Sequence, residues 1–284
     1  MQDHPNTALI VEGGGFKSAF TTGILDAFHA ADYRPFNRYV GISGGSIALS
    51  YFLGRQYRFG LESLLHLAGD PNFTAYSRTF SEQGFINLDI LAAVAREKIV
   101  FNLKTAMRES LRHPVHFVAT DEITGEAAYL VPNRHNWLDA IIASSAIPFF
   151  TKGKHNFRSR AYIDGGCSDP LPAKWAYEQG ARNVLVLRTW PRKMRFTKSW
   201  ADVAGSFYYR ADPILSTIVN RGHAIYNDSA AYLENPPEDL TVIQLAPEKL
   251  LATGTYLNSV DTIMKDYGHG LDVGLQYVEG LRGI

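Results

Sequence analysis

Two segments of this chain combine an apolar run, a glycine-rich turn and a helical pattern, and this combination limits the possible folds more than any other feature. In residues 8–31 and again in residues 39–53, four mostly apolar residues precede a turn with two or three glycines, and apolar residues then recur at helical spacing. A short apolar run of this kind is typical of a strand buried on both faces. We therefore expect two strand–turn–helix units in one sheet that is covered by helices.

The same alternation of strands and helices continues along most of the chain. Further strands are predicted at residues 115–119, 127–131, 161–163, 184–187 and 242–245. Further helices are predicted after Asn87 and at residues 137–146 and 171–179, and the last third is mainly helical. This alternation favours an α/β fold with a central, mostly parallel sheet. Because no linker is evident, we expect one domain over residues 1–284, in which residues 190–284 form a mainly helical C-terminal extension.

Composition and charge restrict the function classes. The chain has 284 residues, and 28 lysine and arginine residues balance 28 aspartate and glutamate residues, which argues against a nucleic-acid partner held by bulk charge. The single cysteine, Cys167, allows no intrachain disulfide and is typical of a reducing compartment. Residues 1–6 lack the basic and apolar segments of a signal peptide, and no apolar run reaches the ~20 residues of a membrane span. We therefore expect a cytoplasmic protein.

Residues 41–45 (GISGG) fit the G-x-S-x-G pattern of a nucleophile elbow. In such an elbow a sharp strand-to-helix turn lifts the serine hydroxyl above the sheet edge, and small flanking residues, here Gly41 and Gly45, let the chain make that turn. The predicted strand before Ser43 and the predicted helix after it provide this context. The helix N-terminus also favours negative charge that develops beside the serine. Taken alone, the pattern fits equally well a glycine-rich turn with an incidental serine.

Gly13, Gly14 and Gly15 also lie between a predicted strand and a predicted helix. Glycines leave backbone N–H groups accessible to a ligand, which suits an oxyanion hole or a phosphate cradle. The segment is not a P-loop, because Phe16 separates Gly15 from Lys17 and no G-K-[ST] follows. A tight turn that permits close helix–strand packing is the structural alternative.

Asp164, Gly165 and Gly166 directly follow a third predicted strand. A carboxylate at a strand end can reach a neighbouring strand end, where the ligand crevice of an open α/β sheet lies. An ordinary Asp-Gly turn is the alternative. Cys167 comes next, and we expect it to be a small packing residue.

In their order along the chain, these segments resemble the motifs of the patatin-like phospholipases, a bacterial and plant family of lipid acyl hydrolases. Residues 13–17 (GGGFK) resemble the family's G-G-G-x-[K/R]-G loop, residues 41–45 match its G-x-S-x-G, and residues 164–166 (DGG) match its D-G-[G/A]. Residues 143–148 (ASSAIP) are similar to its A-S-x-A-x-P segment. Ser18 stands where the family usually has glycine. Because a serine can begin a helix, we expect the loop to keep its form.

The resemblance implies a three-layer α/β/α fold and a catalytic dyad in place of a triad. Ser43 would attack the acyl ester bond of a lipid, and Asp164 would take the serine proton and return it to the leaving alcohol. The loop of residues 13–15 would form the oxyanion hole, and Lys17 would fix that loop. An acyl-enzyme would form, with no cofactor and no metal.

Two other functions can be compared with this one. In an α/β-hydrolase with a Ser-Asp-His triad, His223 or His269 would be the base, because both follow Asp164 in the sequence. Only one clear strand precedes the strand of Ser43, which is too few for that fold. The other alternative is a non-catalytic or regulatory protein that binds lipid or an anionic ligand through the loop of residues 13–15. No H-E-x-x-H motif is present, so we expect no metal site.

Residues 179–201 contain six basic side chains and no acidic one, with tryptophan and phenylalanine interleaved. Basic and aromatic residues together favour contact with anionic lipid headgroups. We therefore expect the segment from Arg188 to Trp200 to make peripheral contact with an anionic membrane surface, and a solvated loop is the alternative. The sequence indicates neither the lipid headgroup, acyl position and chain length nor the oligomeric state.

Overall fold

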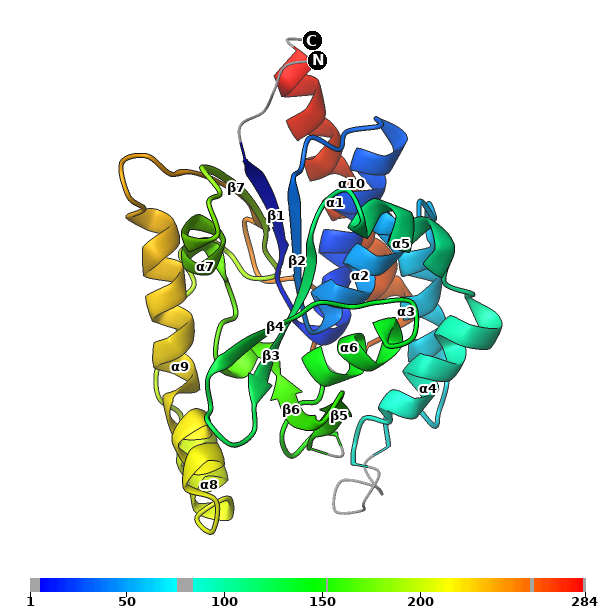
Figure 1. Ribbon diagram of the computed structural model, residues 1–284. Coiled ribbons are helices and arrows are strands. Elements are labelled where there is room, and N and C mark those ends of the chain that lie inside the picture. The colour runs from blue at the N-terminus through cyan, green and yellow to red at the C-terminus, as the bar shows by residue number, and fades with distance from the viewer. Residues whose placement is uncertain (1–5, 76–83, 152, 256–257, 283–284) are drawn as a thin grey trace.

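The computed structural model describes residues 6–75, 84–151, 153–255 and 258–282 (Figure 1). Residues 1–5, which belong to the polar N-terminus discussed above, lie outside this part. Within it, eight strands form one sheet. They are β1 (Thr7–Val11), β2 (Arg38–Ile42), β3 (Val115–Asp121), β4 (Ala127–Leu130), β5 (His155–Phe157), β6 (Arg160–Asp164), β7 (Asn183–Leu187) and β8 (Thr241–Leu245).

The strand order across the sheet is β5-β6-β3-β2-β1-β7-β8, and β4 also pairs with β3. Neighbours from β3 through β2, β1 and β7 to β8 are parallel, whereas β4, β5 and β6 are antiparallel to their partners. The predicted α/β fold with a mostly parallel sheet is therefore confirmed.

Helices cover both faces of this sheet (Figure 1). They are α1 (Ser18–Ala30), α2 (Gly44–Leu53), α3 (Phe59–Gly69), α4 (Leu88–Ala93), α5 (Leu103–Ser110), α6 (Trp137–Ser144), α7 (Ala173–Glu178), α8 (Trp200–Tyr208), α9 (Pro213–Glu234) and α10 (Val260–Arg282). The described residues also contain the short helical segments η1 (Gly15–Lys17), η3 (Val94–Lys98) and η4 (Gly165–Cys167). In the described ranges, none of the helices is both long and apolar enough to cross a bilayer.

The strand β1 shows why the protein has three layers. Leu9 and Val11 belong to the core under α1 and α2, while Ala8 and Ile10 belong to the core under α7 and α9. All four side chains are completely buried. Because successive side chains of a strand point to opposite faces, an apolar run that is buried throughout requires helices on both sides.

Most predicted elements are present, with some changes at their ends. The helix predicted for residues 137–146 ends at Ser144 as α6. The helices α3 and α5 were not predicted from the sequence. α3 follows Arg58, which has a left-handed φ of 67° and whose N–H donates to the Asp26 carboxylate of α1 at 3.1 Å. This beginning is stabilised by a distant residue and not by a local cap, so no sequence signal precedes it.

The C-terminal part of the chain is integrated into the same layers. β8 extends the sheet beside β7, and α10 packs along α1 (Figure 1). The two helices approach closely, since a Cβ atom at Gly274 would lie 2.7 Å from the Cβ of Ala27. Residues 190–284 therefore contribute a strand to the sheet as well as helices to its faces.

Candidate active site

The ends of β1 and β2 place the glycine loop and Ser43 side by side. The strands are parallel neighbours with Val11 opposite Gly41, so both chain segments leave the sheet at the same edge. Gly13 follows β1, and a Cβ atom at this position would lie only 2.8 Å from the Cβ of Ser43. Glycine is therefore required here by the close approach of the two turns.

Ser43 is the turning point between β2 and α2. Its backbone has φ 50° and ψ −127°, which L-residues rarely adopt, and the residue is 6% exposed. The flanking glycines leave no room for side chains: a Cβ atom at Gly45 would overlap the Val11 carbonyl oxygen, and one at Gly41 would lie 2.7 Å from the Cα of Ser46. Strain at a polar residue between a strand and a helix is the geometry that a nucleophile elbow has.

Asp164 reaches Ser43 from the other side of β3. β6 is antiparallel to β3 with Asp164 opposite Ala119, and β3 pairs in parallel with β2 through Val118 and Ile42. Ser43 directly follows Ile42. Ser43 and Asp164 therefore lie on either side of β3, at nearly the same position along that strand. The carboxylate is brought to the serine by this antiparallel register and not by a shared edge of parallel strand ends.

One oxygen of the Asp164 carboxylate is held, and the other is open. Oδ1 accepts the N–H of Gly166 at 2.8 Å, whereas the buried Oδ2 has no hydrogen-bond partner among the described residues. Burial raises the pKa of Asp164 to about 6, and the Ser43 side chain and the Gly166 N–H oppose this rise. Such a carboxyl group is a stronger base than an exposed aspartate and is still largely ionised at neutral pH.

The segment of residues 143–148 connects the two polar residues. The N–H of Ser43 donates to Oγ of Ser144 at 2.9 Å, and the N–H of Asp164 donates to the carbonyl oxygen of Ala146 at 2.9 Å. Ile147 lines the cavities beside the serine that are described below. This segment, which the sequence marked only by its similarity to a family motif, therefore fixes the serine and the aspartate to one support.

The glycine loop presents free backbone donors. Gly14 and Gly15 have φ values of 145° and 57°, and the N–H of Phe16 donates to the carbonyl oxygen of Thr255 at 3.1 Å. Among the described residues, the N–H groups of Gly14 and Gly15 have no hydrogen-bond partner. Both glycines line a cavity together with Ser43. Two free donors beside a serine are what an oxyanion hole requires.

Ser18 begins α1 as expected, although its side chain makes no capping hydrogen bond. Its hydroxyl is buried without a partner among the described residues and lies close to Gly44, the first residue of α2. A serine side chain therefore fits at this position of α1, against the beginning of α2.

Lys17 connects the glycine loop with the C-terminal part of the chain. Its Nζ donates to the carbonyl oxygen of Thr253 at 2.8 Å and lies 4.5 Å from the ring centre of Trp190. Burial lowers the pKa of Lys17, and the carboxylate of Asp266 opposes that shift. The same carboxylate accepts the N–H of Thr253 at 2.7 Å. Lys17 is therefore placed to fix the loop, and it lines neither of the cavities that reach Ser43.

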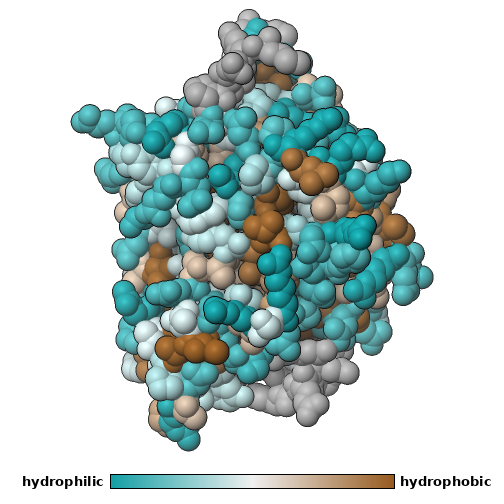
Figure 2. Space-filling view, viewed as in Figure 1, coloured by the Kyte–Doolittle hydropathy of each residue, from teal (hydrophilic) through white to brown (hydrophobic). Residues whose placement is uncertain are grey.

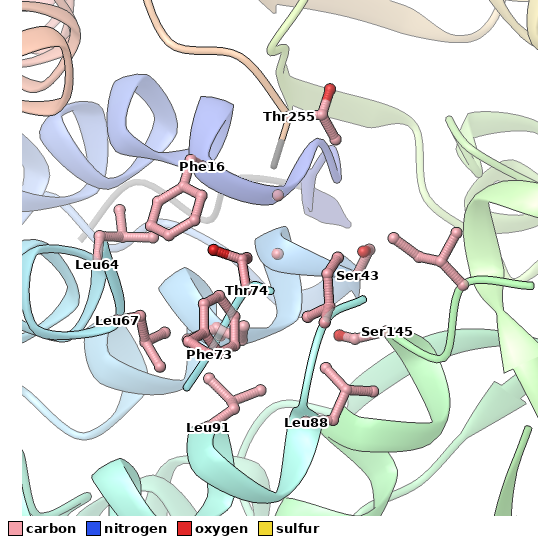
Figure 3. A pocket seen from close by; sticks show the side chains of 15 residues that line it. Phe16, Ser43, Leu64, Leu67, Phe73, Thr74, Leu88, Leu91, Ser145 and Thr255 are labelled. Carbon is pink, nitrogen blue, oxygen red and sulfur yellow. The ribbon is translucent and has the colours of Figure 1, made fainter. Parts of the chain in front are cut away.

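Two cavities of different character meet at Ser43. The narrower, of about 60 Å³, is lined mainly by apolar side chains of α3, α4 and the segment before α4, with Ser43 at one side (Figure 3). The wider, of about 470 Å³, contains Asp164 and the glycine loop. Its other lining residues include Cys167, Trp190, Phe196, Ser199, Asp202, His223 and Tyr226. A serine between an apolar cavity and a wider one that also contains charged and polar side chains can receive a molecule that has one apolar and one polar part.

Comparison with known proteins shows the family of this chain. The family profile described as "Patatin-like phospholipase" matches residues 9–177, more than half of the chain, and spans the glycine loop, Ser43 and Asp164. This chain belongs to the patatin-like phospholipase family. It is 31% identical to the uncharacterized protein YjjU of Escherichia coli strain K12 over 93% of this chain and 74% of YjjU. Membership places the patatin-like chain among the lipid acyl hydrolases, and its fold is the three-layer α/β/α fold that the resemblance implied.

The patatin-like profile ends before the C-terminal third. A second profile, a domain of unknown function designated DUF6363, matches residues 213–283. Among solved structures, VipD from Legionella pneumophila aligns with a TM-score of 0.47 and 11% identity, over 97% of this chain and 67% of VipD.

A buried network joins the glycine loop of this patatin-like protein to α9. Glu12 accepts the Tyr226 hydroxyl at 2.9 Å and the N–H of Thr189 at 2.5 Å. The Thr189 hydroxyl donates to the carbonyl oxygen of Gly13 at 2.6 Å. Arg188 donates to the Tyr226 hydroxyl at 2.7 Å, and its Nε lies 4.0 Å from the Glu12 carboxylate. Burial raises the pKa of Glu12, and the Arg188 charge opposes that rise.

No motif or spacing in the sequence indicated this network. Its one available signal was Glu12, an acidic residue between a buried strand and the glycine loop, which needs a partner when buried. The assignment of Arg188 to a membrane-contacting segment is wrong, because its side chain is completely buried and faces Glu12.

The histidines considered for a triad lie in different places. His269, on α10, packs against the ring of Phe20 with 5.0 Å between ring centres. His223, on α9, lines the wide cavity, and its Nδ1 lies 4.0 Å from the carboxylate of Asp202. Among the described residues, neither histidine has a hydrogen bond to Ser43 or Asp164. Cys167 also lines the cavity, and burial raises the pKa of its thiol, which disfavours a reactive thiolate.

Proposed function

We propose that this protein is a serine acyl hydrolase that cleaves acyl ester bonds of phospholipids or related lipids through a dyad of Ser43 and Asp164. The observation that carries the proposal is the position of Ser43. It lies on a strained strand–helix turn between a narrow apolar cavity and a wider cavity of mixed lining, and the wider one is lined by Asp164, whose Oδ2 has no hydrogen-bond partner among the described residues. The acyl chain would occupy the narrow apolar cavity, and the leaving alcohol with its headgroup would occupy the wide one.

The reaction follows from the free groups at this point. Oγ of Ser43 attacks the ester carbonyl carbon while Oδ2 of Asp164 takes the serine proton. The N–H groups of Gly14 and Gly15 stabilise the oxyanion of the tetrahedral intermediate. When the intermediate collapses, the carbon–oxygen bond to the alcohol breaks and Asp164 returns the proton to that alcohol. Water, activated by Asp164, then attacks the acyl-enzyme and releases the fatty acid.

A labelling experiment separates this proposal from a non-catalytic lipid-binding function. A fluorophosphonate probe should label the native protein at Ser43, and neither heat-denatured protein nor Ser43→Ala should react. The same preparations should release fatty acid from p-nitrophenyl esters of graded chain length and from phosphatidylcholine, with Ser43→Ala as the blank. Absence of both labelling and turnover in folded protein would overturn the enzymatic assignment and favour a binding role for the glycine loop.

A further inference from the structure

The short helix α8 exposes its apolar side chains to solvent. Trp200, Val203, Phe207 and Tyr208 are 89%, 43%, 67% and 58% exposed. At 3.6 residues per turn these four positions fall on one side of the helix. An ordinary surface helix has the opposite arrangement, with its apolar side against the core and its polar side in water.

Polar groups lie on the inner side of α8 and at its beginning. Its inner side meets α9, where the hydroxyl groups of Ser206 and Ser216 lie 2.7 Å apart. The helix begins with a capping box, in which Asp202 accepts the N–H of Ser199 and donates its own N–H to the Ser199 hydroxyl. The outward apolar side is therefore a defined feature of the fold and not a result of fraying.

The charge around this outward side is basic. Lys198 precedes α8 and Arg210 follows it, and both are exposed, as are Arg192 and Lys193 in the preceding segment. The guanidinium of Arg210 lies 4.6 Å from the ring centre of Phe207. Between residues 188 and 210 the single acidic residue is Asp202, whose carboxylate is engaged in the capping box.

The outward side of α8 lies beside the candidate active site. Ser199 and Asp202, at the beginning of the helix, line the wide cavity that contains Asp164. The ring of Phe149 lies 5.5 Å from the ring of Tyr208. Phe149 is two residues after Ile147, which lines both cavities. Figure 1 shows α8 beside the first turns of α9, at the border of the molecule. On the face shown in Figure 2, hydrophilic residues predominate and the apolar ones lie in small separate areas.

We propose that the outward side of α8 docks this protein onto an anionic lipid surface, so that the wide cavity opens toward the lipid. Trp and Tyr at a water–lipid boundary, with Lys and Arg beside them, are the composition of an interfacial helix. The four side chains expose on the order of 500 Å², at about 150–250 Å² for a whole aromatic side chain. This area is smaller than the ~800 Å² per partner of a standard protein interface, so a lipid surface fits better than a second copy of the chain.

Vesicle sedimentation tests the proposal independently of hydrolysis. Ser43→Ala protein is mixed with vesicles of phosphatidylcholine or of an equimolar mixture of phosphatidylcholine and phosphatidylglycerol. We expect binding to the mixed vesicles that falls as salt rises, and a Trp200 emission that shifts to shorter wavelength. Trp200→Ser/Phe207→Ser should lower the bound fraction at least tenfold. Leu111→Ser/Ile123→Ser, which removes two equally exposed apolar side chains elsewhere, should bind normally.

Two results would overturn the proposal. One is equal vesicle binding by the two double variants, since α8 would then not carry the contact. The other is a dimer in light scattering that Trp200→Ser/Phe207→Ser converts to a monomer without a change in vesicle binding, because the outward side of α8 would then join two copies. Because the binding experiment uses Ser43→Ala protein, its result does not depend on hydrolysis. The docking proposal can therefore fail while the wild-type protein still hydrolyses lipid, and the protein can dock without hydrolysing lipid.

Discussion

Residues 9–177 and residues 213–283 both reach the glycine loop, but they do so through different kinds of interaction. The first region brings Ser43, Asp164 and the loop together through strand ends and tight turns, and each of these residues stands beside glycines in the sequence. The second region contributes Tyr226 to Glu12, the carbonyl of Thr255 to Phe16 and that of Thr253 to Lys17. The difference indicates that the groups proposed to react are concentrated in one region, while contacts from both regions position them.

The largest expected effect concerns the reacting groups of the first region. Ser43→Ala and Asp164→Asn should each lower kcat by roughly 10³-fold or more, because one removes the nucleophile and the other the base. The double variant should be scarcely worse than either single one, since the two groups act as a unit. Ester turnover of purified protein, with circular dichroism as the folding control, measures this. If folded His223→Ala or His269→Ala lost activity as completely, a triad would replace the dyad.

A smaller effect is expected from the second region. Tyr226→Phe removes the hydroxyl that bonds Glu12 and Arg188, so the glycine loop loses part of its support. We expect kcat to fall roughly tenfold with little change in KM, and stability to fall by about 1–3 kcal/mol because buried polar groups lose a partner. Tyr232→Phe, on the same helix, is the matched control. Equal kcat values for the two variants would show that the Tyr226 hydroxyl contributes to the stability of the fold but not to the positioning of the site.

The pH dependence of kcat/KM tests the proposed role of Asp164. Asp164 must be ionised to accept the serine proton, and burial raises its pKa to about 6. Protonation as the pH falls through this value should therefore lower kcat/KM about tenfold for each further pH unit. Asp26→Asn removes another carboxyl group whose pKa is raised to about 6, and the profile should not change. A midpoint near pH 4 would contradict the proposed role of Asp164 as the base.

The smallest effect is an increase in stability. Ser43 has a φ of 50°, which costs a residue with a side chain on the order of 1–3 kcal/mol. Ser43→Gly should relieve this strain, but glycine also increases the entropy of the unfolded chain, which lowers stability. We expect a net gain of about 1 kcal/mol in the free energy of unfolding. Ser43→Ala keeps the strain and should show no such gain. The urea concentrations at the unfolding midpoints of the two variants measure this difference in stability. Equal midpoints would show that the backbone at Ser43 is not strained.

Much of the first region could be predicted from the sequence, because its information is local. A buried strand needs a continuous apolar run, and an elbow needs glycines on both sides of the serine, so β1, β2 and the positions of Ser43 and the glycine loop could be read from short segments. The strands predicted at residues 115–119 and 127–131 and the helix predicted after Asn87 are confirmed as β3, β4 and α4 for the same reason.

The tertiary structure alone decided how these segments meet and what supports them. Glu12 and Tyr226 are 214 positions apart, and no periodicity or turn residue relates them. The antiparallel register of β6, which brings Asp164 to Ser43, depends on pairing with β3 and not on residues 160–164 themselves. The inner side of α8 faces α9 through the hydroxyl groups of Ser206 and Ser216, whereas the sequence of α8 alone would favour burial of its aromatic side. Local sequence fixes backbone conformation, but hydrogen-bond partners and exposure are fixed only when distant segments pack.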